Sequence, residues 1–173
     1  MKFVLNKDFL SYESEVLLNY LKSYNWFKKY NYKPTYPNEA CFNNLMMKAS
    51  KNHINDDDIS EIKEQLLKIT TNEDYSNIYK NNEDVILLAN EVLDKTKNIF
   101  IEMNKSFGFK IFDTYKVNIT KYCPGGSYDP KEGNILIKLR NNRINLSTLL
   151  HEMFHIGIEE FIIQHFNINH LTK

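Results

Sequence analysis

The sequence predicts an α+β fold in which a mostly helical portion, residues 1–107, precedes a small sheet and a final long helix in residues 108–173. All five glycines lie after residue 107, so the first portion lacks the residue that most easily forms left-handed turns and bulges. Apolar and polar side chains alternate in 115–120 and 134–139, which is typical of strands. Apolar residues recur at helical spacing in 146–166. We expect the two portions to pack as one compact domain.

Several helices are expected in the first portion. Apolar residues recur at steps of three and four over 9–30, and Pro34 and Pro37 end that pattern. A short helix is expected over 38–49. Three aspartates at 56–58 form an acidic helix start before an apolar stripe that reaches Ile69. A long helix over 83–105 ends near Gly108.

The second portion is expected to form two strands and one helix. A strand over 115–120 is followed by a turn-rich irregular loop over 123–130 and by a second strand over 134–139. Asn145 or Ser147 can cap the final helix, 146–166. Its apolar side is expected to comprise Leu149, Leu150, Met153, Phe154, Ile158, Ile162 and Phe166.

Composition and charge exclude several classes of protein. The 22 basic and 22 acidic residues give a formal net charge of zero, so total charge offers no attraction to nucleic acid or to an anionic membrane. Cys41 and Cys123 are too few for a disulfide-stapled small domain and too far apart for a CxxC metal site. The apolar run over 1–5 is shorter than a signal peptide requires, and no window is long enough for a membrane helix. We expect a cytoplasmic protein with no membrane partner.

The final helix contains His151-Glu152-Met153-Phe154-His155, an HExxH motif. Residues four apart in a helix lie about 40° apart around the axis and about 6 Å apart along it. His151 and His155 can therefore bind one zinc ion from the same face. Glu152 lies beside that face, where its carboxylate can accept a proton from water at the metal. The motif predicts metal-assisted hydrolysis, and its apolar flanks favour this over a chance coincidence of residues.

Segment 134–139, followed by 147–155, resembles the strand-then-helix core of SprT-like and related minimal gluzincin metallopeptidases. The resemblance covers roughly residues 95–173 and depends mostly on the HExxH motif. It implies a zincin-like core, a small sheet with an edge strand beside the active-site helix. In such peptidases the strand before the helix is the edge strand, so we expect strand 134–139 to pair with an extended peptide substrate.

A catalytic zinc site needs a third protein ligand and leaves the fourth position for water. His170 lies beyond the expected helix end, where the chain can turn back over the metal. SprT-like peptidases likewise take a third ligand, a histidine, from a segment after the active-site helix. This chain lacks the glycines that usually flank that histidine. His170 is the expected third ligand.

The alternatives to His170 stay open: Glu159 or Glu160, a residue past Lys173, or no third protein ligand. Glu159 continues the face of the motif but lies about 12 Å along an unbroken helix from His151, unless Gly157 breaks the helix. Glu160 is the neighbouring carboxylate. Other gluzincins place a ligand Glu further beyond the second His, so the ligand can also lie past Lys173.

Other chemically capable residues have competing interpretations. Tyr128, before the second strand, is the best candidate for a phenol donor to a developing oxyanion, although a loop tyrosine more often serves packing or lies on the surface. Cys123 has no evident basic neighbour and is expected to be a structural thiol. Trp26 and the aromatic residues up to Tyr36 interleave with lysines. That pattern can stack nucleobases, but we favour a place in the core for it.

These observations predict a zinc metallopeptidase. His151, His155 and His170 bind Zn²⁺, Glu152 is the general base toward zinc-activated water, and Tyr128 is a further catalytic candidate. The expected partner is a peptide or protein substrate in extended conformation. One alternative is a zincin-fold binding or regulatory module with weak or no turnover. Another is a nucleic-acid-associated SprT-like protease, which the neutral charge and the lack of a zinc ribbon or basic tail disfavour.

Overall fold

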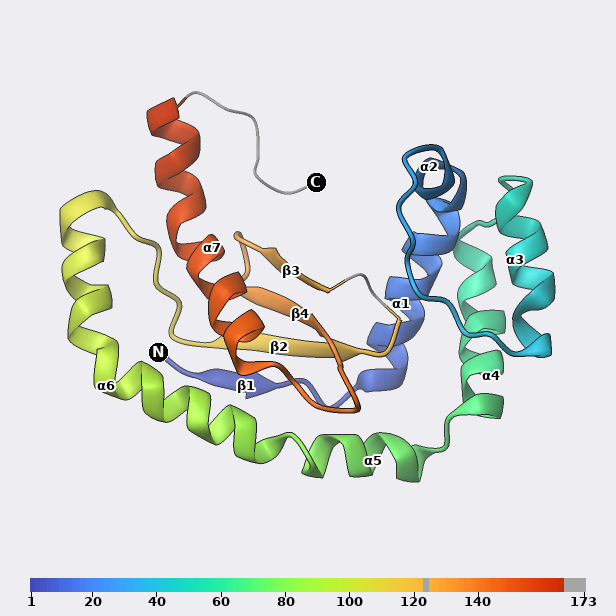
Figure 1. Ribbon diagram of the computed structural model, residues 1–173, viewed down its shortest axis with the longest axis horizontal. Coiled ribbons are helices and arrows are strands. Elements are labelled where there is room, and N and C mark those ends of the chain that lie inside the picture. The colour runs from blue at the N-terminus through green and yellow to red at the C-terminus, as the bar shows by residue number, and fades with distance from the viewer. Residues whose placement is uncertain (123–124, 167–173) are drawn as a thin grey trace. The chain divides into compact units, whose positions relative to one another are not determined.

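The computed structural model describes residues 1–122 and 125–166, apart from the side chains of Asn72 and Glu73 (Figure 1). The chain divides into two compact units. The sheet unit comprises residues 1–6, 81–119 and those from 125 onward, and the helical unit comprises residues 7–80 and 120–124. This division differs from the expected one at residue 107, because the N-terminal strand and a long helix belong with the sheet. None of the described helices combines the length and apolar character needed to span a bilayer.

The sheet is four-stranded and mixed, with the order β1-β2-β4-β3. Strand β1 pairs in parallel with β2, and β3 pairs antiparallel with β4. The strands are β1 (Phe3–Leu5), β2 (Tyr115–Thr120), β3 (Gly126–Asp129) and β4 (Asn134–Lys138). The expected strands over 115–120 and 134–139 are confirmed.

Two expectations about the sheet are wrong. The segment predicted to be an irregular loop contains β3, and β3 rather than β4 is the edge strand on that side. Strand β4 lies between β2 and β3, and its residues Ile135, Leu136 and Ile137 are all buried. The short polar sequence of β3 carries little strand propensity, so its conformation depends on pairing with β4.

Two long helices pack in the sheet unit. Helix α6 (Glu83–Phe107) ends as predicted at Gly108, which has the left-handed backbone angle φ = 75°. Helix α7 (Leu146–Phe166) has the predicted bounds, and the Asn145 side chain caps it by accepting a hydrogen bond from the Thr148 amide at 3.0 Å. Helix α7 lies across the sheet and packs against β3 and β4, whereas α6 packs against β1 and α7 (Figure 1).

Gly157 allows α7 to approach the core closely. Phe109 is fully buried, and its ring lies so close to Gly157 that a Cβ atom at this position would overlap it. The Lys110 amide also donates to the Gly157 carbonyl at 2.8 Å. Helix α7 continues unbroken through Gly157, so this glycine serves packing rather than a helix break.

The buried side of α7 differs from the expected apolar side. The buried residues are Leu149, Glu152, Met153, Ile156, Gly157 and Glu159. Phe154 and Phe166 are 42% and 65% exposed, contrary to expectation. The helix therefore turns two carboxylates toward the core, and burying a carboxylate costs free energy unless hydrogen bonds or charges compensate it.

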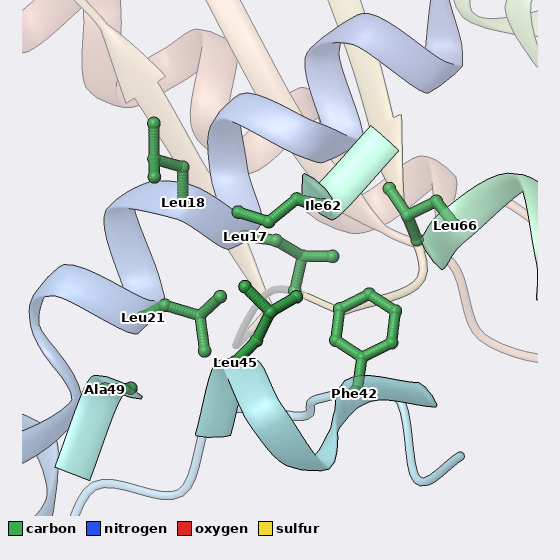
Figure 2. Packing of buried hydrophobic residues seen from close by; sticks show 8 residues of the cluster. All are labelled: Leu17, Leu18, Leu21, Phe42, Leu45, Ala49, Ile62 and Leu66. Atoms are coloured by element: carbon green, nitrogen blue, oxygen red, sulfur yellow. The ribbon is translucent and has the colours of Figure 1, made fainter. Parts of the chain in front are cut away.

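The helical unit has five helices among the described residues: α1 (Phe9–Lys22), α2 (Tyr24–Lys29), α3 (Asn43–Ser50), α4 (Ile59–Ile69) and α5 (Asn72–Lys80). Short 3₁₀ turns, Ala40–Phe42 and Asp56–Asp58, precede α3 and α4. The helix expected over 9–30 is interrupted at Ser23. Side chains from α1, α3, α4 and the first 3₁₀ turn form the apolar core that Figure 2 shows, comprising Leu17, Leu18, Leu21, Phe42, Leu45, Ala49, Ile62 and Leu66.

Three of the aromatic residues around α2 lie outside this core, contrary to the favoured interpretation, whereas Tyr36 packs against it as expected. Trp26, Tyr30 and Tyr32 are 50%, 57% and 49% exposed. No residue of α2 is buried.

A buried carboxylate joins two parts of the helical unit. Glu13 on α1 accepts hydrogen bonds from the Thr120 hydroxyl at 2.6 Å, the Lys121 amide at 2.7 Å and the Tyr75 hydroxyl at 3.4 Å. Burial raises the pKa of Glu13, although these hydrogen bonds oppose the shift. The folded unit therefore keeps a proton on Glu13 more readily than the unfolded chain does.

The raised pKa of Glu13 determines how the stability of the folded protein changes with pH. The contribution of Glu13 to stability decreases as pH rises from its ordinary pKa of 4.5 toward the folded pKa. Glu13→Gln keeps an acceptor oxygen without the charge, so we expect a higher free energy of unfolding than wild type at pH 8 and a flatter pH profile. Glu13→Ala should lower it by about 1–3 kcal/mol, because Thr120 and Lys121 lose their acceptor. Urea unfolding between pH 5 and 8 measures both, and identical pH profiles for wild type and Glu13→Gln would contradict the assignment.

Candidate active site

The two histidines of the HExxH motif meet on one face of α7. Their Nε2 atoms lie 2.9 Å apart, and their ring centroids lie 4.4 Å apart. His151 is exposed and His155 is half-buried, so solvent reaches the pair. One turn of regular helix thus brings the same nitrogen of each ring to a common point, as the spacing predicts.

The pair fits a shared metal ion. Two nitrogen ligands of one tetrahedral zinc ion, each about 2.1 Å from it, lie about 3.4 Å apart. The Nε2 atoms are a little closer than this, so a small rotation of either ring would open the required gap. A ligating histidine also carries its proton on the other nitrogen, and His155 Nδ1 is buried without a hydrogen-bond partner among the described residues.

Glu152 lies between α7 and the edge strand. It is 8% exposed, and burial raises the pKa of its carboxyl, while the nearby His151 and His155 lower it. An ideal Cβ atom at Gly126 of β3 would lie 2.8 Å from Glu152 Cδ and would overlap one carboxylate oxygen. Gly126 therefore provides the space that the Glu152 carboxylate occupies.

Tyr128 supports His155 from the same strand. Its ring stacks on the His155 ring, with centroids 5.4 Å apart and planes 11° apart. Burial raises the pKa of the Tyr128 hydroxyl, and the nearby charges of Glu159 and Glu152 raise it further. Glu159 is 1% exposed and lies one helical turn beyond His155. The tyrosine thus stacks on a metal-ligand candidate near a second buried carboxylate.

The alternation of β3 explains this arrangement. Residues two apart in a strand share a face, so Gly126 and Tyr128 both face α7. One accommodates Glu152 and the other contacts His155. The role of Gly126 and the burial of Glu159 were not predicted, because the segment that contains β3 was expected to be an irregular loop.

The predicted third ligands have different outcomes. Within residues 1–122 and 125–166, no group of three or more His, Cys, Asp or Glu side chains is placed to hold a metal ion. Glu159 is buried beside Tyr128 and Glu160 is exposed, and the helix break at Gly157 that could bring Glu159 to the metal does not occur. His170, like Cys123, lies outside the described residues.

Comparisons with protein-family models, with curated proteins and with solved structures find no match to this chain. The residues and geometry of the site itself are therefore the basis on which a function can be proposed.

Two glycines, Gly157 within α7 and Gly126 of β3, allow a matched test of this packing. Gly157→Ala places a methyl group against the Phe109 ring, which is buried and cannot move away, so we expect a loss of about 1–3 kcal/mol in the free energy of unfolding. Gly126→Ala places it against the end of the flexible Glu152 side chain, so we expect a smaller loss and a displaced carboxylate. Denaturant unfolding and a crystal structure of Gly126→Ala measure these effects. Equal losses, with Glu152 unmoved, would contradict the proposed role of Gly126.

Proposed function

We propose that the protein is a zinc-dependent metallopeptidase with a zincin-like core, as the resemblance of its strand-then-helix segment to SprT-like peptidases implies. The observation that carries the proposal is the convergence of His151 Nε2 and His155 Nε2, 2.9 Å apart, beside the buried carboxylate of Glu152. Two imidazoles and an adjacent carboxylate are the residue types that metal-assisted hydrolysis requires.

Each residue has a distinct role in this proposal. His151 and His155 hold the zinc ion, which when bound supplies Lewis-acid polarisation of the scissile carbonyl and of the attacking water. The Glu152 carboxylate accepts the proton of that water and delivers it to the leaving amine. Burial makes the carboxylate a stronger base than an exposed glutamate, which suits proton transfer near neutral pH.

Tyr128 is proposed here as a positioning residue. Its ring lies flat on His155, with the planes 11° apart. This stacking restrains the His155 ring, which favours a fixed direction for its Nε2 lone pair. His170 remains the proposed third ligand.

The substrate is proposed to pair with β3 rather than with β4. The Lys138 amide donates to the Gly125 carbonyl at 2.7 Å, and antiparallel alternation then directs the main-chain groups of Ser127 and Asp129 toward β4. The main-chain groups of Gly126 and Tyr128 point to the other side, where no strand of the described residues pairs. An extended peptide can add there as a further strand, next to the histidine pair.

Metal content and hydrolysis test the proposal together. We expect about one zinc ion per chain by elemental analysis, lost in His151→Ala and retained in the control His53→Ala, which changes an exposed histidine outside the motif. Glu152→Gln should keep zinc but lower cleavage of unstructured protein substrates by about 10²–10⁴-fold, because an amide cannot accept the proton.

Two outcomes would count against the enzyme. Cleavage by Glu152→Gln at the wild-type rate would remove Glu152 from the mechanism. A zinc-loaded wild type that cleaves nothing across a broad peptide library would favour a binding or regulatory module instead.

The edge strand gives a separate test. In Glu152→Gln loaded with zinc, addition of an extended peptide should slow hydrogen exchange at the Gly126 and Tyr128 amides. The Ser127 and Asp129 amides should already be protected by β4 and should change little. Nuclear magnetic resonance resolves these four neighbouring amides, and unchanged exchange at Gly126 and Tyr128 on peptide binding would exclude β3 as the substrate strand.

A further inference from the structure

The helical unit exposes a group of aromatic and basic side chains, which we call the aromatic–lysine surface: Trp26, Lys28, Lys29, Tyr30, Tyr32 and Lys33. Helix α2 and the residues that follow it carry all six. The three aromatic residues are each about half exposed, Tyr30 most at 57%. Large aromatic side chains grouped in this way on a surface indicate a binding site more often than isolated exposed ones do.

The end of α2 holds this surface in a defined shape. Asn31 has a left-handed backbone, φ = 54°, and its amide donates to the Lys28 carbonyl at 3.3 Å. The Tyr32 amide donates to the Phe27 carbonyl at 2.8 Å, and the two rings stack with centroids 5.8 Å apart. These are the two hydrogen bonds and the apolar contact of a Schellman motif. The exposed rings are therefore presented by an ordered helix end.

The rings form a continuous series beside a hollow. Trp26 lies 4.9 Å from Tyr30 and 5.3 Å from Phe27, measured between centroids. Phe27 and Tyr32 also line a hollow of about 340 Å³, together with Lys28 and Lys33. Aromatic faces and ammonium groups thus border the same space, which is large enough for a planar ring.

Charge is distributed unevenly in this part of the chain. Residues 16–38 contain four lysines and no aspartate or glutamate, although the whole protein is neutral. Lys22 pairs with Asp56 at 2.5 Å, and Lys29 Nζ lies over the Tyr30 ring, 5.3 Å from its centroid. Within the described part of the chain, Lys28 and Lys33 form no ion pair. The surface therefore offers unneutralised positive charge to an anion.

We propose that the aromatic–lysine surface binds single-stranded nucleic acid, with bases stacked on Trp26, Tyr30 or Tyr32 and phosphates near Lys28, Lys29 and Lys33. A single strand has unpaired bases whose flat faces can stack on aromatic rings, and a charged phosphate backbone that lysines can bind. Aromatic side chains flanked by lysines can bind both parts at once. A duplex hides those faces, and an acidic peptide carries the charge without them. The neutral total charge is an average over the molecule and does not describe this locally basic surface. The aromatic–lysine surface shares no residue with the HExxH site.

Trp26 is the only tryptophan, so its fluorescence reports on this surface alone. An oligothymidylate of about twelve nucleotides should quench it saturably, and a duplex of equal length should bind more weakly. Three phosphate contacts predict a slope of about −2 for log K against log salt concentration. Polyglutamate of matched charge should leave the fluorescence unchanged.

Variants separate stacking from charge, with anisotropy of a labelled oligonucleotide as the readout. Tyr30→Ala should weaken binding roughly five- to hundred-fold. Lys28→Gln with Lys33→Gln should reduce the salt slope to about −0.7. The matched control, Lys95→Gln with Lys97→Gln, changes two exposed lysines on α6 and should leave both affinity and slope unaltered.

Three results would overturn the proposal. The first is no change in fluorescence or anisotropy at about 20 mM salt, where electrostatic attraction is strongest. The second is equal binding of the duplex, or equal quenching by polyglutamate, which would assign the surface to a duplex or to an acidic protein segment. The third is an equal effect of the two lysine pairs, which would make the attraction a property of the whole molecule. Trp26→Phe removes the fluorescence signal and should retain binding measured by anisotropy, because a phenyl ring can still stack on a base.

Discussion

The close packing of α7 against the buried Phe109 ring is the constraint on which the rest of the site depends. Gly157 permits that distance because it has no side chain to keep the helix away. Once this point of the helix is fixed, the 100° advance per residue determines where every other side chain of α7 points. The His151–His155 pair then lies beside β3, and the carboxylates of Glu152 and Glu159 turn inward.

The burial of Glu152 and Glu159 lowers the stability of the fold, and it changes the acid–base properties of Glu152. A buried carboxylate loses hydration, so its neutral form is favoured and its pKa rises, as for Glu152. Water solvates an exposed glutamate and weakens it as a base, whereas Glu152 keeps only 8% of its surface exposed. Tyr128 stacks on the His155 ring, and burial together with the charge of the second carboxylate, Glu159, raises the pKa of its hydroxyl. Stability given up in this way is typical of functional sites rather than of a packing core.

The sheet supplies the other half of the site through its strand order. Because β4 pairs on both sides, its amides are committed to the sheet, and the short strand β3 forms the boundary beside α7. Alternate residues of a strand share a face, so Gly126 and Tyr128 of β3 both face the helix. Their main-chain groups point along the sheet to its edge. A four-residue strand can therefore contact the proposed catalytic groups and present its outer main-chain groups for the proposed pairing with an extended chain.

The sequence by itself determined the features that depend on near neighbours along the chain. These are the α+β class, the bounds of α7 and its Asn145 cap, the end of α6 at Gly108, the strands β2 and β4, and the convergence of His151 and His155, which needs only one turn of helix. Tertiary structure decided the strand order, the edge position of β3, the fit between Gly126 and Glu152, and the exposure of Trp26. Each of these depends on contacts between segments that are far apart in sequence or on which face of a helix finds a partner. Periodicity fixes which side chains share a face, but only packing in three dimensions selects the face that is buried.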